Sequence, residues 1–142
     1  MWASLLLAAM AAGDPVVIAE FDEAELPASL TADAAKVRRV EDGAGGALEV
    51  TAIAPPKDGR AVVTLPLPVK DIRGFEAISF RASATQGKSA TFLEFASAGG
   101  WRGLWAKEIL EREPREFVIP LRQFREFGSG LSADPANLHR LR

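Results

Sequence analysis

Apolar and polar residues alternate with a period of two along several short runs of this chain. Four of these runs read FEAISFRAS, ATFLEFAS, WRGLWAKEI and REFVIPL. Successive side chains of a β-strand point to opposite faces, so this alternation predicts strands that each bury one face. The expected strands cover residues 15–21, 35–40, 47–53, 60–67, 75–83, 90–97, 101–109, 115–121 and 137–142.

Turn signals separate these strands. The segments EDGAGG at 41–46, PPKDG at 55–59, DIRG at 71–74 and TQGK at 85–88 combine glycine with proline or polar residues that favour tight turns. Short strands at such regular spacing predict an all-β fold in which two antiparallel sheets pack as a sandwich. The alternation also assigns an inward face to the strands. Its residues include Ile78, Phe80, Leu93, Phe95, Phe117 and Ile119.

Length and composition indicate one ordinary globular domain. The chain has 142 residues, of which 48% are apolar and 25% are charged, with 17 basic and 19 acidic side chains. The charges are interspersed, and the absence of a basic block argues against a nucleic-acid partner. Cysteine is absent and His139 is the single histidine. Disulfides, thiolate nucleophiles and most histidine-based metal or triad chemistry therefore lack their side chains.

The first 12 residues, MWASLLLAAMAA, have the apolar character of a secretory signal peptide. The AMA tripeptide at 9–11 matches an A-x-A-like cleavage site, so we expect a mature chain that begins near Gly13 and is secreted or periplasmic. The run lacks a Lys or Arg before Leu5, and it is too short to span a bilayer as a helix. A leader and a single β-sandwich domain over 13–142 are expected, without a membrane span. The alternative is a disordered or core-packed N-terminus.

Three parts of the chain resemble the galactose-binding-like β-jelly-roll superfamily. They are FDEAE with GGALEV (21–25 and 45–50), DIRGFEAISFRAS (71–83) and REFVIPLRQF (115–124). This superfamily includes many non-catalytic carbohydrate-binding modules and the domain of the complex I intermediate-associated protein 30. The resemblance implies a jelly-roll sandwich that binds carbohydrate or a protein partner and catalyses no reaction. It also implies attachment to a larger catalytic protein.

The resemblance covers most of residues 16–142 and has two departures. Pro114, Arg115 and Glu116 stand where the family has a Trp before V-x-I-P. Such domains also finish with a further strand of the type F-x-I-D-x-I, which pairs with the first strand, whereas this chain finishes with LHRLR. We therefore expect a sandwich that lacks its C-terminal strand and leaves one sheet edge unprotected.

Trp101 and Trp105 are the best candidates for a ligand-binding site. Residues i and i+4 of a strand share a face, so these two residues line up with Lys107. Flat indole rings suit the apolar faces of sugars, and their N–H groups donate to hydroxyls. Glu94 and Arg81, on strands expected to be neighbours, add polar contacts. The open alternative is that one or both indoles belong to the core, because Trp is heavily buried on average.

Two groups of carboxylates offer further chemistry. Glu20 and Asp22 lie on one face at the end of the first strand, where they can contribute to a Ca²⁺ site completed by backbone carbonyls. The resemblance implies a structural ion of this kind, and the alternative is a solvated pair. The run EILEREPREF contains four glutamates, but glycoside hydrolysis needs two of them in one cleft. Their mixed-sign neighbours favour a solvated turn.

The sequence thus predicts an exported, non-catalytic carbohydrate-binding module that binds glycan through aromatic residues on one sheet face. The alternative is a protein-interaction or assembly domain similar to the complex I intermediate-associated protein 30. An exposed indole in a concave groove favours a sugar ligand, whereas a broad, flat apolar patch favours a protein partner.

Overall fold

The computed structural model is an all-β protein. It describes residues 5–9, 16–23, 25–41, 45–53, 60–85, 87–97, 104–126 and 138–141. Within these ranges the strands are β1 (Leu5–Ala9), β2 (Val16–Ala19), β3 (Thr31–Asp33), β4 (Ala35–Glu41), β5 (Gly46–Ala52), β6 (Val62–Pro66), β7 (Phe75–Ala82), β8 (Ser89–Ser97), β9 (Leu104–Leu110), β10 (Arg115–Pro120), β11 (Arg125–Glu126) and β12 (Leu138–Leu141). A 3₁₀ turn, η1 (Leu121–Gln123), follows β10. A search of the described residues for a helix with the length and apolar character to cross a membrane finds none.

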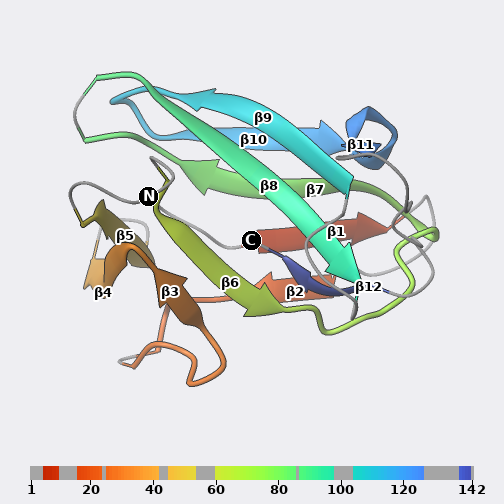
Figure 1. Ribbon diagram of the computed structural model, residues 1–142, viewed down its shortest axis with the longest axis horizontal. Helices are drawn as coiled ribbons and strands as arrows, with labels where there is room; N and C mark the ends of the chain where they lie inside the picture. The colour runs from red at the N-terminus through yellow and green to blue at the C-terminus, as the bar shows by residue number, and fades with distance from the viewer. Residues whose placement is uncertain are drawn as a thin grey trace.

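The described strands form two large antiparallel sheets and one hairpin. The first sheet has the strand order β10-β7-β1-β2, and the second has the order β11-β9-β8-β12-β6-β3. Strands β4 and β5 pair with each other alone in the described part of the chain. The two large sheets are the layers of a sandwich, with β8 in front of β7 in Figure 1. The predicted fold class, an antiparallel β-sandwich, is confirmed.

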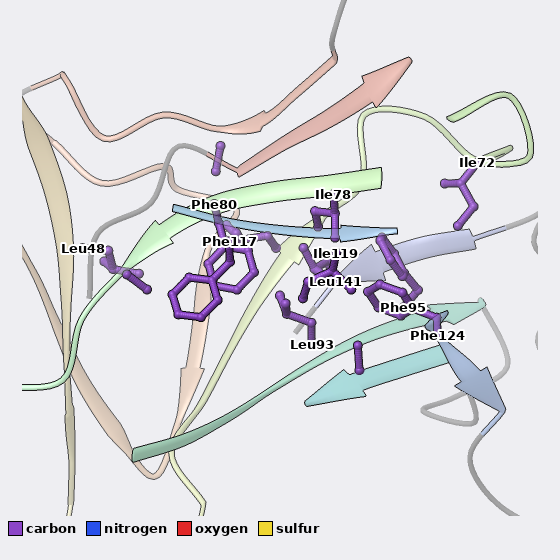
Figure 2. Packing of buried hydrophobic residues seen from close by; sticks show 14 of the residues in the cluster. Leu48, Ile72, Ile78, Phe80, Leu93, Phe95, Phe117, Ile119, Phe124 and Leu141 are labelled. Atoms are coloured by element: carbon purple, nitrogen blue, oxygen red, sulfur yellow. The ribbon is translucent and has the colours of Figure 1, made fainter. Parts of the chain in front are cut away.

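The core lies between the two layers and contains the residues that the alternation placed there. All six predicted inward residues are at most 8% exposed. The rings of Phe80 and Phe117 stack with their centroids 5.0 Å apart, and those of Phe95 and Phe124 are 5.1 Å apart and tilted (Figure 2). Each fully buried side chain of this size stabilises the fold by about 1.5–3 kcal/mol. The buried cluster as a whole takes residues from both sheets, so its packing holds the two layers together.

Strand β1 lies inside the four-stranded sheet, between β2 and β7. Leu6 opposes Val17 of β2 on one side and Ser79 of β7 on the other. The register shifts once on each side of β1, whereas β10 pairs with β7 without a shift. Part of the segment expected as a leader thus forms a strand. Strand β2 lies at the edge of this sheet in the described part of the chain.

A hydrogen-bonded clamp holds the chain after β2 against the β4–β5 hairpin. Arg39 Nε donates to the carbonyl oxygen of Phe21 over 2.7 Å, and Arg39 Nη2 donates to that of Asp22 over 3.0 Å. The backbone N–H of Gly46 donates to Asp22 Oδ1 over 2.9 Å. The backbones meet so closely that a Cβ at Gly46 would lie 1.7 Å from the Phe21 oxygen. Only glycine fits this contact.

Candidate functional site

The candidate site lies on the outer face of the six-stranded sheet, where β8 pairs with β9. Leu93 is buried and marks the inner face of β8, so the residues on either side of it belong to the outer face. Across the strand pair, Glu94 opposes Trp105 and Phe92 opposes Lys107. Four residues with aromatic or charged side chains therefore occupy neighbouring positions on one face.

These four residues form a two-by-two pattern. Directly opposed Cβ atoms in an antiparallel pair are about 4.5–5.5 Å apart, and diagonal neighbours are about 7–8 Å apart. Phe92 and Trp105 lie on one diagonal, while Glu94 and Lys107 lie on the other. Trp105 and Lys107 lie two residues apart on β9 and so share a face, as the alternation predicts. For Trp105 this placement rests on the position of its backbone in the strand. Trp101, the other predicted aromatic ligand residue, lies outside the described residues.

Phe92 presents an exposed aromatic ring, with 39% of its surface accessible. The guanidinium carbon of Arg60 lies 5.0 Å from the ring centroid, and Nζ of Lys107 lies 5.7 Å from it. Arg60 precedes β6 on one side of β8, and Lys107 belongs to β9 on the other side. At an exposed site each cation–π contact contributes about 0.5–1 kcal/mol, which is enough to favour this arrangement. The ring is therefore flanked by two positive charges.

Glu94 points to the same outer face but is only 8% exposed. The alternation predicts the direction of this side chain and does not predict its shielding. A shielded carboxylate needs polar or charged neighbours, because burying an isolated charge is costly. Glu94 is therefore better suited to orienting the side chains around it than to making the first contact with a ligand.

Arg81 does not join this face. It lies on β7 in the four-stranded sheet, opposite Glu116 of β10, and its side chain is exposed on the outer side of that layer. The prediction that its strand neighbours the strand of Glu94 is wrong, because the chain passes from one sheet to the other between β7 and β8. Alternation assigns a face within a strand, but it does not say which strands pair.

Glu20 and Asp22 do not fit a calcium site. Asp22 Oδ1 accepts a hydrogen bond from the Gly46 N–H, and the carbonyl oxygens of Phe21 and Asp22 accept from Arg39. A guanidinium thus already occupies the backbone oxygens that a Ca²⁺ ion would need. The described residues contain no cluster of three or more His, Cys, Asp or Glu that could hold a metal ion. Asp22 acts as part of the clamp, and Glu20 is an exposed residue beside it.

The acidic run after β9 is exposed and partly paired. Glu111 forms an ion pair with Lys88 over 3.2 Å. Together with Gly87, Arg112 and Glu113, these two residues line an open depression of about 300 Å³. Its charges have mixed sign, and Glu111, Arg112 and Glu113 are exposed to solvent. This is the arrangement of a solvated turn, as the sequence predicts.

Sequence reasoning does not single out Phe92 and Arg60 as site residues. The outward direction of Phe92 is readable from its alternation with Leu93 in ATFLEFAS, so a search for outward-facing aromatic residues would have found it. Arg60 has no local signal, because its approach to Phe92 depends on the placement of β6 and β8 in one sheet.

Comparison of the chain with protein-family models, with curated proteins and with solved structures finds no match in any of the three. The likeness to galactose-binding-like jelly rolls therefore stays a hypothesis that rests on the sequence motifs. The outer face of β8 and β9 is the part of the structure from which a function can be argued.

Proposed function

We propose that the protein is a non-catalytic carbohydrate-binding module that holds glycan on the outer face of β8 and β9. The observation that carries the proposal is the pairing of Glu94 with Trp105 beside the exposed ring of Phe92. Aromatic rings cover the C–H faces of sugars, and nearby charged groups bind their hydroxyls. A sugar chain can lie across the two strands at the exposed Phe92.

Calorimetry and affinity electrophoresis against a panel of polysaccharides test this proposal. Phe92→Ala and Trp105→Ala should each weaken binding by about tenfold, which corresponds to the loss of one stacking contact. Val118→Ala, on the outer face of the opposite layer, is the control and should leave binding unchanged. Trp101→Ala tests the aromatic residue outside the described ranges. Binding to no polysaccharide, or unchanged binding in both aromatic variants, would refute the proposal.

The sequence motifs support the same proposal independently. The segments at 21–25, 71–83 and 115–124 resemble those of jelly-roll binding modules, and a two-layer antiparallel sandwich is the architecture that such modules require. The proposal therefore includes jelly-roll topology and attachment to a larger catalytic protein. The gene sequence downstream of the codon for Arg142 tests the attachment, because it must encode a catalytic domain.

Export to the cell surface, medium or periplasm is also part of the proposal. The leader expected over 1–12 includes β1, so cleavage near Gly13 would remove a strand that lies between β2 and β7. Cell fractionation followed by intact-mass measurement tests both whether the protein is exported and whether it is cleaved near Gly13. An exported chain that begins near Gly13 supports the proposal. A cytoplasmic chain that retains β1 refutes it and makes this strand part of the mature fold.

A protein-interaction or assembly domain is the second candidate, and the outer face of the four-stranded sheet favours it. Val118 is 61% exposed and Val17 is 39% exposed. They are the ends of a cross-strand row that runs Val17, Leu6, Ser79 and Val118. Two exposed valines on one sheet face suit an apolar protein surface better than a hydroxyl-rich sugar. Photo-crosslinking from position 118 in cells should give one discrete adduct that Val17→Lys abolishes, and its absence would count against this candidate.

A further inference from the structure

We infer that the ligand of the β8–β9 face is an acidic glycan, whose carboxylate or sulfate groups are bound by Arg60 and Lys107 around Phe92. The inference rests on the proposed function and narrows it to one class of polysaccharide. It follows from the position of these two cations, from their lack of carboxylate partners among the described residues, and from the shielding of the nearest acidic residue on the same face.

The two cations converge on one ring. The guanidinium of Arg60 is 5.0 Å and the ammonium of Lys107 is 5.7 Å from the centroid of Phe92, and the two residues come from opposite sides of β8. Their separation is at most the sum of these two distances. A sugar that lies against the exposed part of the Phe92 ring would therefore have its acidic substituents within reach of both positive charges.

Neither cation is neutralised by a described acidic side chain. Ion pairs among the described residues are found at Arg38, Arg39, Arg73 and Lys88, and these four pairs include neither Arg60 nor Lys107. Arg60 and Lys107 are thus like charges held near one another, which repel unless an anion lies between them. Glu94, the acidic neighbour of Phe92 on the outer face of β8, is shielded from solvent. Shielding does not cancel the charge of Glu94, but the two cations outnumber this single carboxylate, so the net charge of the three residues is positive.

The surroundings favour an acidic glycan over a nucleic acid. A nucleic acid is usually bound by an extended basic track, because each nucleotide adds a phosphate. Here the whole chain carries a formal net charge of −2, and the cationic patch consists of two residues beside one exposed ring. An aromatic platform flanked by two cations matches a sugar ring that carries an acidic group.

Calorimetry on the full chain tests the inference with oligogalacturonate, a sulfated galactan oligosaccharide and a neutral galactan oligosaccharide of matched length. At least one acidic ligand should bind about tenfold more tightly than the neutral one, and added salt should weaken this preference. The double variant Arg60→Gln/Lys107→Gln should lose about tenfold in affinity for that acidic ligand and keep its affinity for the neutral one. Comparing the carboxylated and sulfated ligands identifies which anionic group is bound.

The matched control is the double variant Lys36→Gln/Arg122→Gln, which removes the same charge from exposed positions on β4 and η1. It should change affinity by less than about twofold, since neither residue belongs to β6, β8 or β9. Lys107→Arg keeps the charge and should keep acidic binding. Circular dichroism melts confirm that each variant is folded.

The outcomes separate the inference from the proposed function. Equal or tighter binding of the neutral oligosaccharide overturns the inference and leaves the carbohydrate-binding function in place. An equal loss in the Lys36→Gln/Arg122→Gln control does the same, because it would reflect overall charge. Binding of no glycan overturns both. Tighter binding of an oligothymidylate than of every glycan overturns both in favour of a nucleic-acid partner.

Discussion

Phe92 and Phe95 lie on the same strand, β8, and face opposite ways. Phe95 is fully buried and packs against the ring of Phe124, whereas Phe92 is well exposed and contacts the cations of Arg60 and Lys107. On the inner face the aromatic ring stabilises the sandwich by removing apolar surface from water. On the outer face the same ring contributes little to the fold. The exposed ring between two cations is the feature on which the proposed glycan site rests.

The largest expected effect separates these two phenylalanines. Phe95→Ala should lower the free energy of unfolding by about 3–5 kcal/mol, because it leaves a cavity between the sheets. Phe92→Ala should lower it by about 1 kcal/mol, through the loss of exposed cation–π contacts and partial burial. Urea denaturation followed by tryptophan fluorescence measures both values. Similar losses in the two variants would show that the outer ring belongs to the core.

The second prediction compares a glycine in a tightly packed position with a glycine that has free space around it. Gly46→Ala should lower the free energy of unfolding by about 1–3 kcal/mol or more. The new Cβ would lie 1.7 Å from the carbonyl oxygen of Phe21, a backbone atom that cannot rotate away. Gly74 is the control, since a Cβ there meets nothing within 4 Å. Gly74→Ala should leave stability unchanged or raise it by up to about 1 kcal/mol. Equal melting temperatures for the two variants would contradict the tight clamp.

The inner faces of the strands were predictable from the sequence, but the arrangement of the strands was not. The runs FEAISFRAS and REFVIPL carry apolar residues at every second position, and their inward residues, such as Phe80 and Phe117, meet in the core. β3 (Thr31–Asp33) has three exposed residues and gives no apolar signal. β1 (Leu5–Ala9) reads LLLAA, a continuous apolar run without alternation, so the same letters also match a leader. Burial drives alternation, and strands without it leave no such pattern.

The same limit applies to the candidate site. The shared face of Trp105 and Lys107 follows from their spacing on one strand, so it could be predicted. The pairing of Glu94 with Trp105 and the placement of Arg81 in the opposite sheet depend on long-range strand order. That order is set by how the whole sandwich packs. The contact between Arg60 and Phe92 also depends on this strand order, so no local sequence pattern predicts it.

The third prediction compares the outer faces of the two sheets. Val118→Ser should change the free energy of unfolding by less than about 0.5 kcal/mol, because the side chain is mostly exposed on β10. It should also leave glycan affinity unchanged, whereas Phe92→Ala should reduce it. Thermal melts and calorimetry on the same samples provide the two readouts. A loss of glycan affinity with Val118→Ser would move the ligand to the four-stranded sheet.

Removal of the exposed ion pair between Asp71 and Arg73 should have the smallest effect on stability. Hydrogen bonds from the Arg73 side chain, at 3.0 and 2.7 Å, and from its backbone N–H, at 3.0 Å, hold the pKa of Asp71 at about 2, below its ordinary value of 3.8. Because the folded-state pKa is lowered, the pair stabilises the fold above pH 3.8. This contribution is lost as the pH falls from there through about 2.

Arg73→Gln removes the guanidinium and should return the pKa of Asp71 towards 3.8, while the melting temperature at neutral pH hardly changes, since the pair is exposed and screened by solvent. Carboxyl-carbon NMR titration of the parent chain and of this variant measures the shift directly. Arg122→Gln, an exposed arginine in η1, is the control and should leave the titration of Asp71 unchanged. A parent Asp71 that titrates near 3.8 would contradict the prediction. It would mean that Arg73 does not hold its hydrogen bonds to Asp71 in solution, so that the turn before β7 is open.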